Sequence, residues 1–116
     1  MPKTWIFDID GTILKHNGYL YETGDEVLPG VLEAFNAIPE TDTILLLTAR
    51  SETQKQTLEC FLREKGIRFN CIIYDLPVGE RILINDKKKS GLLTAFAINK
   101  ERDSALDLNF EIDINK

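Results

Sequence analysis

The chain has 116 residues, of which 43% are hydrophobic and 28% charged, and its formal net charge is −5. This length predicts a single domain covering residues 1–116, and the acidic balance argues against sequence-independent binding to nucleic acid. No apolar run approaches the roughly eighteen residues of a membrane span, and Cys60 and Cys71 are spaced neither as a disulfide framework nor as a metal site. We therefore expect a cytoplasmic protein with two reduced cysteines.

The first predicted strand is the apolar run from Thr4 to Ile9, which is rich in β-branched and aromatic residues. Asp8 and Asp10 lie at its end, and Gly11 then stops it. Two carboxylates on one face of a strand repel each other unless a proton or a cation lies between them. The pair therefore suggests a hard cation such as Mg²⁺ and metal-assisted phosphoryl transfer, although an ordinary Asp-Gly turn is the alternative.

The next stretch, residues 14–25, contains the hairpin signal Asn17-Gly18. It predicts a β-hairpin flap beside the strand end. His16, the single histidine, could contact a substrate or transfer a proton, but an exposed polar residue on a hairpin explains it more simply. Tyr19 could line a pocket or only pack against the sheet.

The rest of the chain alternates between helix-like and strand-like patterns, with a basic turn at residues 87–91. The segment Leu93–Ile98 could be helix or strand, and we favour a strand. The predicted elements are a helix from Pro29 to Pro39, a buried strand at Thr43–Leu47, a helix at Ser51–Lys65, strands at Phe69–Tyr74, Arg81–Ile84 and Leu93–Ile98, and an edge strand at Leu106–Ile114.

This order predicts an α/β fold with a mostly parallel, Rossmann-like sheet flanked by helices, a hairpin flap after the first strand and no inserted cap domain. Right-handed crossovers place the carboxyl ends of all parallel strands at one edge. Asp8, Asp10, Thr48 and Asp86 each follow a predicted strand. We therefore expect the fold to bring these four side chains into one polar site.

Three short motifs resemble those of the haloacid-dehalogenase-like superfamily of phosphatases. Asp8-Ile9-Asp10-Gly11-Thr12 resembles its first motif, Thr48-Ala49-Arg50 its second, and Asn85-Asp86 its fourth. The stretch from Leu76 to Lys88 also looks like that of small capless members linked to capsule and other surface-polysaccharide synthesis. Taken singly, Thr48 could merely cap a helix, and Asn85-Asp86 could be a simple turn.

The resemblance implies a role for each matching residue. Asp8 would attack phosphorus to form an aspartyl-phosphate, and Asp10 would protonate the leaving oxygen and then activate water. The phosphoryl oxygens would be held by the Ile9 and Ala49 N–H groups, Thr48, Arg50 and a lysine. Mg²⁺ would be held by Asp8, the Asp10 backbone carbonyl and either Asp86 or the carbonyl oxygen of Asn85.

The lysine of the third motif is hard to locate in this sequence. Relatives often place it shortly before the fourth strand, but residues 74–81 contain no lysine. Lys88 is favoured because it follows Asp86 closely. The alternatives are its neighbours Lys87 and Lys89, and, on the preceding helix, Lys55 and Lys65.

The expected function is Mg²⁺-dependent hydrolysis of a phosphomonoester, on a sugar phosphate or another small polar phosphate of surface-polysaccharide synthesis. A site without a cap would be open to water, so a second copy of the chain could cover it. Two alternatives stay open: a non-catalytic module that binds a phosphate ligand or serves assembly, and a phosphotransferase.

Overall fold

A parallel three-stranded sheet lies at the centre of the computed structural model, which describes residues 1–108. Its strands are β1 (Thr4–Asp8), β2 (Thr43–Leu47) and β3 (Cys71–Ile73), in the order β1-β2-β3. Asp8 pairs with Leu47, and Leu47 pairs with Ile73. The carboxyl ends of the three strands therefore lie side by side at one edge of the sheet.

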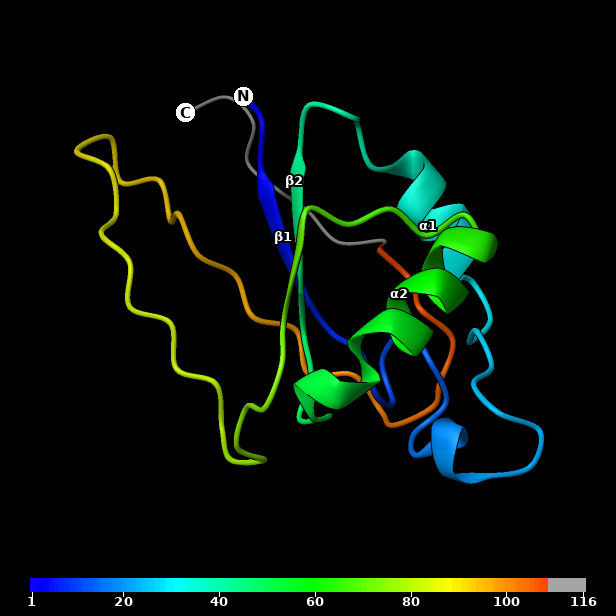
Figure 1. The fold of residues 1–116 in the computed structure, drawn as a ribbon. Helices are drawn as coiled ribbons and strands as arrows, with labels where there is room; N and C mark the ends of the chain where they lie inside the picture. The colour runs from blue at the N-terminus through cyan, green and yellow to red at the C-terminus, as the bar shows by residue number, and fades with distance from the viewer. Residues whose placement is uncertain (109–116) are drawn as a thin grey trace.

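Two α-helices, α1 (Val31–Ala37) and α2 (Lys55–Glu64), pack on the same side of this sheet (Figure 1). Short 3₁₀ segments, η1 (Gly18–Leu20) and η2 (Glu52–Gln54), precede them. The Ser51 hydroxyl accepts a hydrogen bond from the Thr53 N–H and so begins η2. After α2, Gly66 takes a φ of 77°, a left-handed conformation that commonly ends helices.

The hydrophobic core fills the space between the sheet and the two helices. Alternate residues of β1 and β2 face it, as the period of a strand requires, and the rings of Phe7 and Phe35 lie 4.7 Å apart between their centroids. The intervening residues of the strands face the opposite side, which no helix covers (Figure 1). The core residues with no exposed surface are Ile9, Ile13, Leu14, Val31, Ile44, Leu46 and Leu62.

Asp42 joins the beginnings of β1 and β2. Its Oδ1 accepts a hydrogen bond from the Lys3 N–H and its Oδ2 one from Trp5 Nε1, each at 2.9 Å. The bond from the Trp5 indole, followed by that from the Lys3 backbone, holds the pKa of this carboxyl below its usual range. A buried charge with two such donors fixes the register at the start of the sheet.

The expected α/β class, its first three strands and its two helices are confirmed, β2 with the expected bounds and the other elements with shorter ones. The predicted hairpin flap is wrong: residues 14–25 form turns and η1, and Leu14 bridges Val27 instead. Asn17 does take a left-handed φ of 56°, but Gly18 then accepts a hydrogen bond from the Tyr21 N–H and begins a 3₁₀ turn.

The predicted strands at Arg81–Ile84 and Leu93–Ile98 are also wrong, because neither segment pairs with a neighbouring strand. Residues 76–99, called the arm below, run out and back on the side of the sheet opposite the helices (Figure 1). At its tip the Lys88 N–H donates to the Leu92 carbonyl at 3.1 Å. A β-strand needs a neighbouring strand to satisfy its backbone N–H and C=O groups, and these two segments have none, so their strand-like sequences do not form a β-ladder.

The described part of the tail does not form the predicted edge strand. Residues 106–108 are not in a strand, and the rest of Leu106–Ile114 lies outside the described residues. Instead the Leu106 N–H donates to the Pro29 carbonyl at 2.9 Å. The Leu106 backbone lies directly against Gly30, whose missing Cβ permits the approach. Within residues 1–108, no helix is both long and apolar enough to cross a membrane.

Candidate active site

The loop after β1 places two carboxylates at the carboxyl edge of the sheet. The N–H groups of Thr12, Ile13 and Leu14 all donate to the Ile9 carbonyl, at 3.0 to 3.2 Å. Gly11 makes this tight turn possible with a φ of 87°. The turn holds Asp8 and Asp10 at fixed positions on either side of buried Ile9.

Arg50 is the centre of a polar cluster at this edge. Its Nε and Nη2 donate to Asp10 Oδ1 at 3.0 and 2.7 Å. Its Nη1 donates to Asp25 Oδ2 at 2.9 Å, and Nη2 also reaches Asp25 Oδ1 at 2.6 Å. One guanidinium therefore binds two carboxylates in a forked geometry, and it joins β2, the first loop and the segment after η1.

Burial and charge act in opposite directions on this guanidinium. Arg50 is only 4% exposed, and burial alone would lower its pKa, but the hydrogen bonds that it donates to Asp25 and Asp10, together with the charges of these carboxylates, outweigh burial and raise the pKa above the ordinary value. The Tyr19 ring covers the guanidinium at 4.1 Å from its centroid. Tyr19 thus walls the cluster, one of the two roles expected from the sequence.

Thr48 completes the cluster from the end of β2. It is fully buried, its Oγ1 donates to Asp10 Oδ2 at 3.0 Å, and the same oxygen accepts from the Arg50 N–H at 3.0 Å. Both oxygens of the Asp10 carboxylate therefore have donors. The structure brings together Asp10, Thr48 and Arg50, as the parallel strand order predicts. Thr48 and Arg50 donate to Asp10 and Asp25, however, and not into an open site for the phosphoryl oxygens that the resemblance assigned to them.

Asp8 lies beside this cluster in a different environment. Its side chain is 42% exposed, and its closest cation is Arg81, with Nη2 at 3.6 Å from Oδ1. Thr12 Oγ1 donates to its Oδ2 at a long 3.4 Å. Burial raises the pKa of Asp8, Arg81 opposes this, and the Asp10 charge adds to the rise. One carboxylate of the pair is firmly bound and the other is accessible.

The predicted residues of the fourth motif and the favoured lysine do not join this site. Asn85, Asp86 and Lys88 belong to the exposed arm. There Asn85 Nδ2 donates to Thr94 Oγ1 at 2.7 Å, and Thr94 Oγ1 in turn donates to the Asp86 carbonyl. No group of three or more His, Cys, Asp or Glu side chains within residues 1–108 could hold a metal ion. Asn85 and Asp86 therefore do not join Asp8 and Asp10 within the described residues, and Mg²⁺ binding stays a prediction.

The two backbone groups assigned to the phosphate also differ. The Ile9 N–H donates to the Leu47 carbonyl at 2.9 Å, so it continues the pairing of β1 with β2. Ala49 is exposed on the turn after β2, between buried Thr48 and Arg50. The Ile9 N–H is therefore not available to a phosphate, whereas Ala49 lies at the surface.

A charged segment near the end of the chain, residues 100–103, lies against the loop after β1. The sequence patterns did not predict this contact. Lys100 Nζ donates to the Gly11 carbonyl at 3.3 Å, and the Asp103 N–H donates to the same carbonyl at 2.9 Å. Asp103 Oδ1 accepts from the His16 N–H at 2.7 Å. Burial lowers the pKa of Lys100, and the Asp103 charge opposes this. The charged run of residues 100–103 is the sequence feature that would have indicated this contact. Asp25, the second partner of Arg50, was also missed, although it is visible in the sequence as an acid close to the predicted flap.

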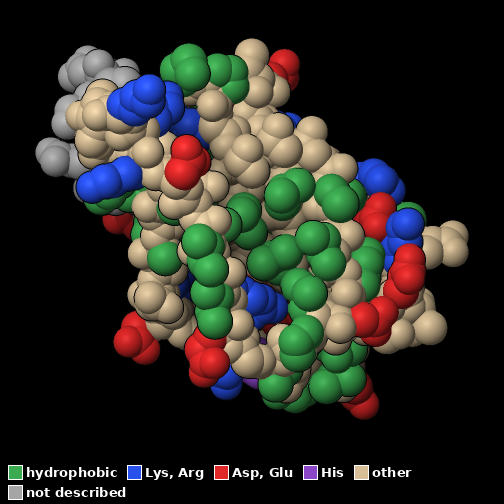
Figure 2. All heavy atoms as spheres, turned by 90° about the vertical axis from the view of Figure 1, so that its left-hand side faces the viewer, with side chains coloured by type: hydrophobic (Ala, Val, Ile, Leu, Met, Phe, Trp, Pro, Cys, Tyr) green, Lys and Arg blue, Asp and Glu red, His purple; other side chains and the backbone are tan. Residues whose placement is uncertain are grey.

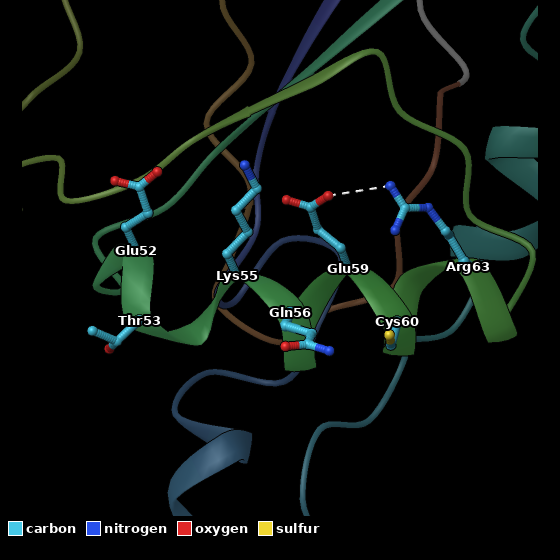
Figure 3. Close-up of a pocket in the computed structure, with 7 residues that line it drawn as sticks. All are labelled: Glu52, Thr53, Lys55, Gln56, Glu59, Cys60 and Arg63. Carbon is cyan, nitrogen blue, oxygen red and sulfur yellow. Dashed lines mark hydrogen bonds and ion pairs between the residues drawn. The ribbon is translucent and has the colours of Figure 1, made fainter.

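A separate hollow lies along η2 and α2 (Figure 3). Glu59 and Arg63 form an ion pair at 3.2 Å within it. It shares no residue with the Arg50 cluster, and its charged side chains lie on successive turns of η2 and α2, so it is the solvated surface of these two helical segments. Its lining residues are Glu52, Thr53, Lys55, Gln56, Glu59, Cys60 and Arg63.

Comparison with known proteins adds no relative. No family model matches the chain, and neither a curated protein nor a solved structure matches it. The case for a function therefore rests on the sequence motifs and on the geometry around Asp8 and Arg50.

Proposed function

We propose that the chain is a haloacid-dehalogenase-like phosphatase that hydrolyses a small phosphomonoester, such as a sugar phosphate, at Asp8. The observation that carries this proposal is the contrast between two neighbouring carboxylates. Asp10 accepts hydrogen bonds from Arg50 and Thr48, whereas Asp8 is 42% exposed and makes only long contacts. A bound carboxylate beside an accessible one suits a positioned acid-base group beside a nucleophile.

The proposed reaction has two steps at this pair. An Asp8 oxygen attacks phosphorus, the phosphate ester bond breaks, and the leaving alkoxide oxygen takes a proton from Asp10. A water molecule that gives its proton to Asp10 then attacks the aspartyl-phosphate, which releases inorganic phosphate and regenerates Asp8. Arg50 fixes the orientation of the Asp10 carboxylate through two hydrogen bonds, so this group keeps one position in both steps.

Two cations lie beside Asp8 or its loop, and they would offset the negative charge that gathers during the reaction. Arg81 is 3.6 Å from Asp8, and Lys100 contacts the carbonyl of Gly11 in the same loop. Both are better placed than Lys88, which lies in the turn at the tip of the arm. Mg²⁺ dependence stays a prediction: a bound ion would supply further positive charge, and Asp8 and Asp10 are the carboxylates of the first motif that would lie beside it.

The first test is phosphate release from a panel of sugar phosphates and other small phosphomonoesters, with Mg²⁺ and with excess chelator. Asp8→Asn should abolish turnover, because the amide is not a nucleophile toward phosphorus, and should leave the fold intact. Glu40→Gln, an isosteric change of an exposed carboxylate, is the matched control and should keep the parent rate. Turnover by Asp8→Asn near the parent rate would overturn the mechanism, and full activity in chelator would overturn Mg²⁺ dependence.

The second test compares two lysines. Lys100→Ala should lower kcat by about a hundredfold, as expected for a preorganised charge near a developing anion. Lys88→Ala should change it little, because Lys88 is exposed in the arm. The opposite result would restore the assignment made from the sequence, and it would show that the arm folds over the site during the reaction.

A non-catalytic module that binds a phosphate ligand is the second candidate. It is favoured by the incomplete set of metal ligands among the described residues. If the parent hydrolyses no phosphomonoester in the panel while inorganic phosphate raises its melting temperature, this second function replaces the first.

A further inference from the structure

One face of the sheet and the arm beside it expose apolar side chains. Ile6 of β1 and Ile73 of β3 point away from the helices and are 49% and 42% exposed. Figure 2 views this side of the molecule and shows hydrophobic side chains gathered across it. The exposed apolar residues of the arm are Val78, Ile82, Leu83, Ile84, Leu93, Phe96 and Ile98.

The backbone of the arm is also without partners over most of its length. Among the described residues, no backbone N–H from residue 78 to residue 87 donates to a backbone carbonyl. An extended segment with free N–H and C=O groups and apolar side chains readily associates with another chain. Natural proteins usually cover such segments, so this one requires an occupant.

Charge indicates a second copy as that occupant. The arm contains four cations, Arg81 and Lys87 to Lys89, and only two carboxylates, Glu80 and Asp86. The chain as a whole has a net charge of −5, so the remainder is more acidic still. A basic apolar segment therefore matches the acidic body of another copy, and two-fold symmetry lets both copies make the same contact.

We propose that two copies of the chain form a dimer by exchanging the outer part of the arm: residues 82–99 of each copy cover the open sheet face of the other, while Arg81 keeps its contact with Asp8 of its own copy. The surface around Ile6, Cys71 and Ile73 of one copy is the binding site, and the apolar residues around Ile82 and Ile84 of the other are the ligand. This assembly does not depend on the proposed phosphatase activity.

The first experiment measures mass by sedimentation over a range of protein concentrations. The parent should be a dimer that dissociates on dilution, and Ile82→Glu combined with Ile84→Glu should raise its dissociation constant at least tenfold. Leu20→Glu is the matched control, since Leu20 is 65% exposed but lies outside this surface, and it should leave the constant unchanged. A parent that stays monomeric at its highest soluble concentration would overturn the proposal.

The second experiment distinguishes exchange between copies from folding of the arm onto its own sheet. Cys71 is exposed on the open face, so Ile84→Cys with Cys60→Ser supplies one thiol on the arm and one on the sheet. Oxidation should give disulfide-linked dimers on a non-reducing gel, and Leu20→Cys with Cys60→Ser should give few. A disulfide within one chain, detected by mass as an oxidised monomer, would overturn the proposal.

Discussion

Two apolar segments of this chain have similar sequences, but one is a buried strand and the other is exposed and unpaired. Thr43–Leu47 is the central strand β2, in which Ile44 and Leu46 have no exposed surface. The segment Arg81–Ile84 is just as rich in β-branched and aliphatic residues, yet Ile82 is 83% and Ile84 90% exposed. The difference shows that a strand is made by its neighbours: β2 has one on each side, and the arm has none.

The same contrast applies to two arginines that each contact one carboxylate of the first motif. Arg50 is buried between Asp10 and Asp25, whereas the side chain of Arg81 is 40% exposed beside Asp8. Removing a buried partner leaves uncompensated charges, whereas a surface pair contributes little.

The largest effect on stability should therefore come from Arg50. Arg50→Met should lower the free energy of unfolding by about 3–5 kcal/mol, because Asp10 and Asp25 lose their common partner. Arg81→Met, the matched control, should cost less than about 1 kcal/mol. Urea unfolding of both variants measures the two values, and equal losses would remove the distinction between the two regions.

An intermediate effect is expected from truncating apolar side chains in the two segments. Leu46→Ala should cost about 2–5 kcal/mol, because it leaves a cavity in the core. Ile84→Ala should stay within about 0.5 kcal/mol at concentrations low enough to keep the protein monomeric. A large loss for Ile84→Ala in the monomer would mean that the arm packs on its own sheet.

The smallest effect is expected where the two regions meet, at Asp8 and Arg81. Arg81→Gln should raise the pKa of Asp8 further, since the guanidinium lowers it in the parent. The Asp8 carboxyl resonance followed by NMR against pH measures this change. Arg63→Gln, whose arginine pairs with Glu59 instead, should leave the pKa unchanged, and no difference between the two variants would contradict the Arg81 contact.

The sign of the associated stability change follows from the raised pKa of Asp8. The folded protein binds this proton more tightly than the unfolded chain does. Its contribution to stability is therefore present below the unfolded pKa and is lost as pH rises through the folded pKa. Arg81→Gln should extend this loss to higher pH, and its stability should approach that of the parent at low pH.

Local sequence patterns were enough to predict most strands and helices of the sheet and its helical layer. Three patterns each predict one element: the apolar run before Asp8, the apolar run of β2 and the helical periodicity after Pro29. The spacing of apolar residues indicates whether one face or both faces of an element are buried. The parallel order then predicts that Asp10, Thr48 and Arg50 meet, and they do. Their meeting needs only the rule that parallel strands end at one edge.

Tertiary structure decided the other features of the site and the conformation of the arm, because these features depend on contacts between residues that are distant in the sequence. The partner shared by Asp10 and Asp25 comes from the end of β2, and Lys100 reaches the first loop across 89 residues of sequence. The arm has a strand-like sequence, but with no neighbouring strand in the described chain its backbone stays unpaired. By itself the sequence determined which segments can be strands, and the packing of the whole chain determined which of them found a partner.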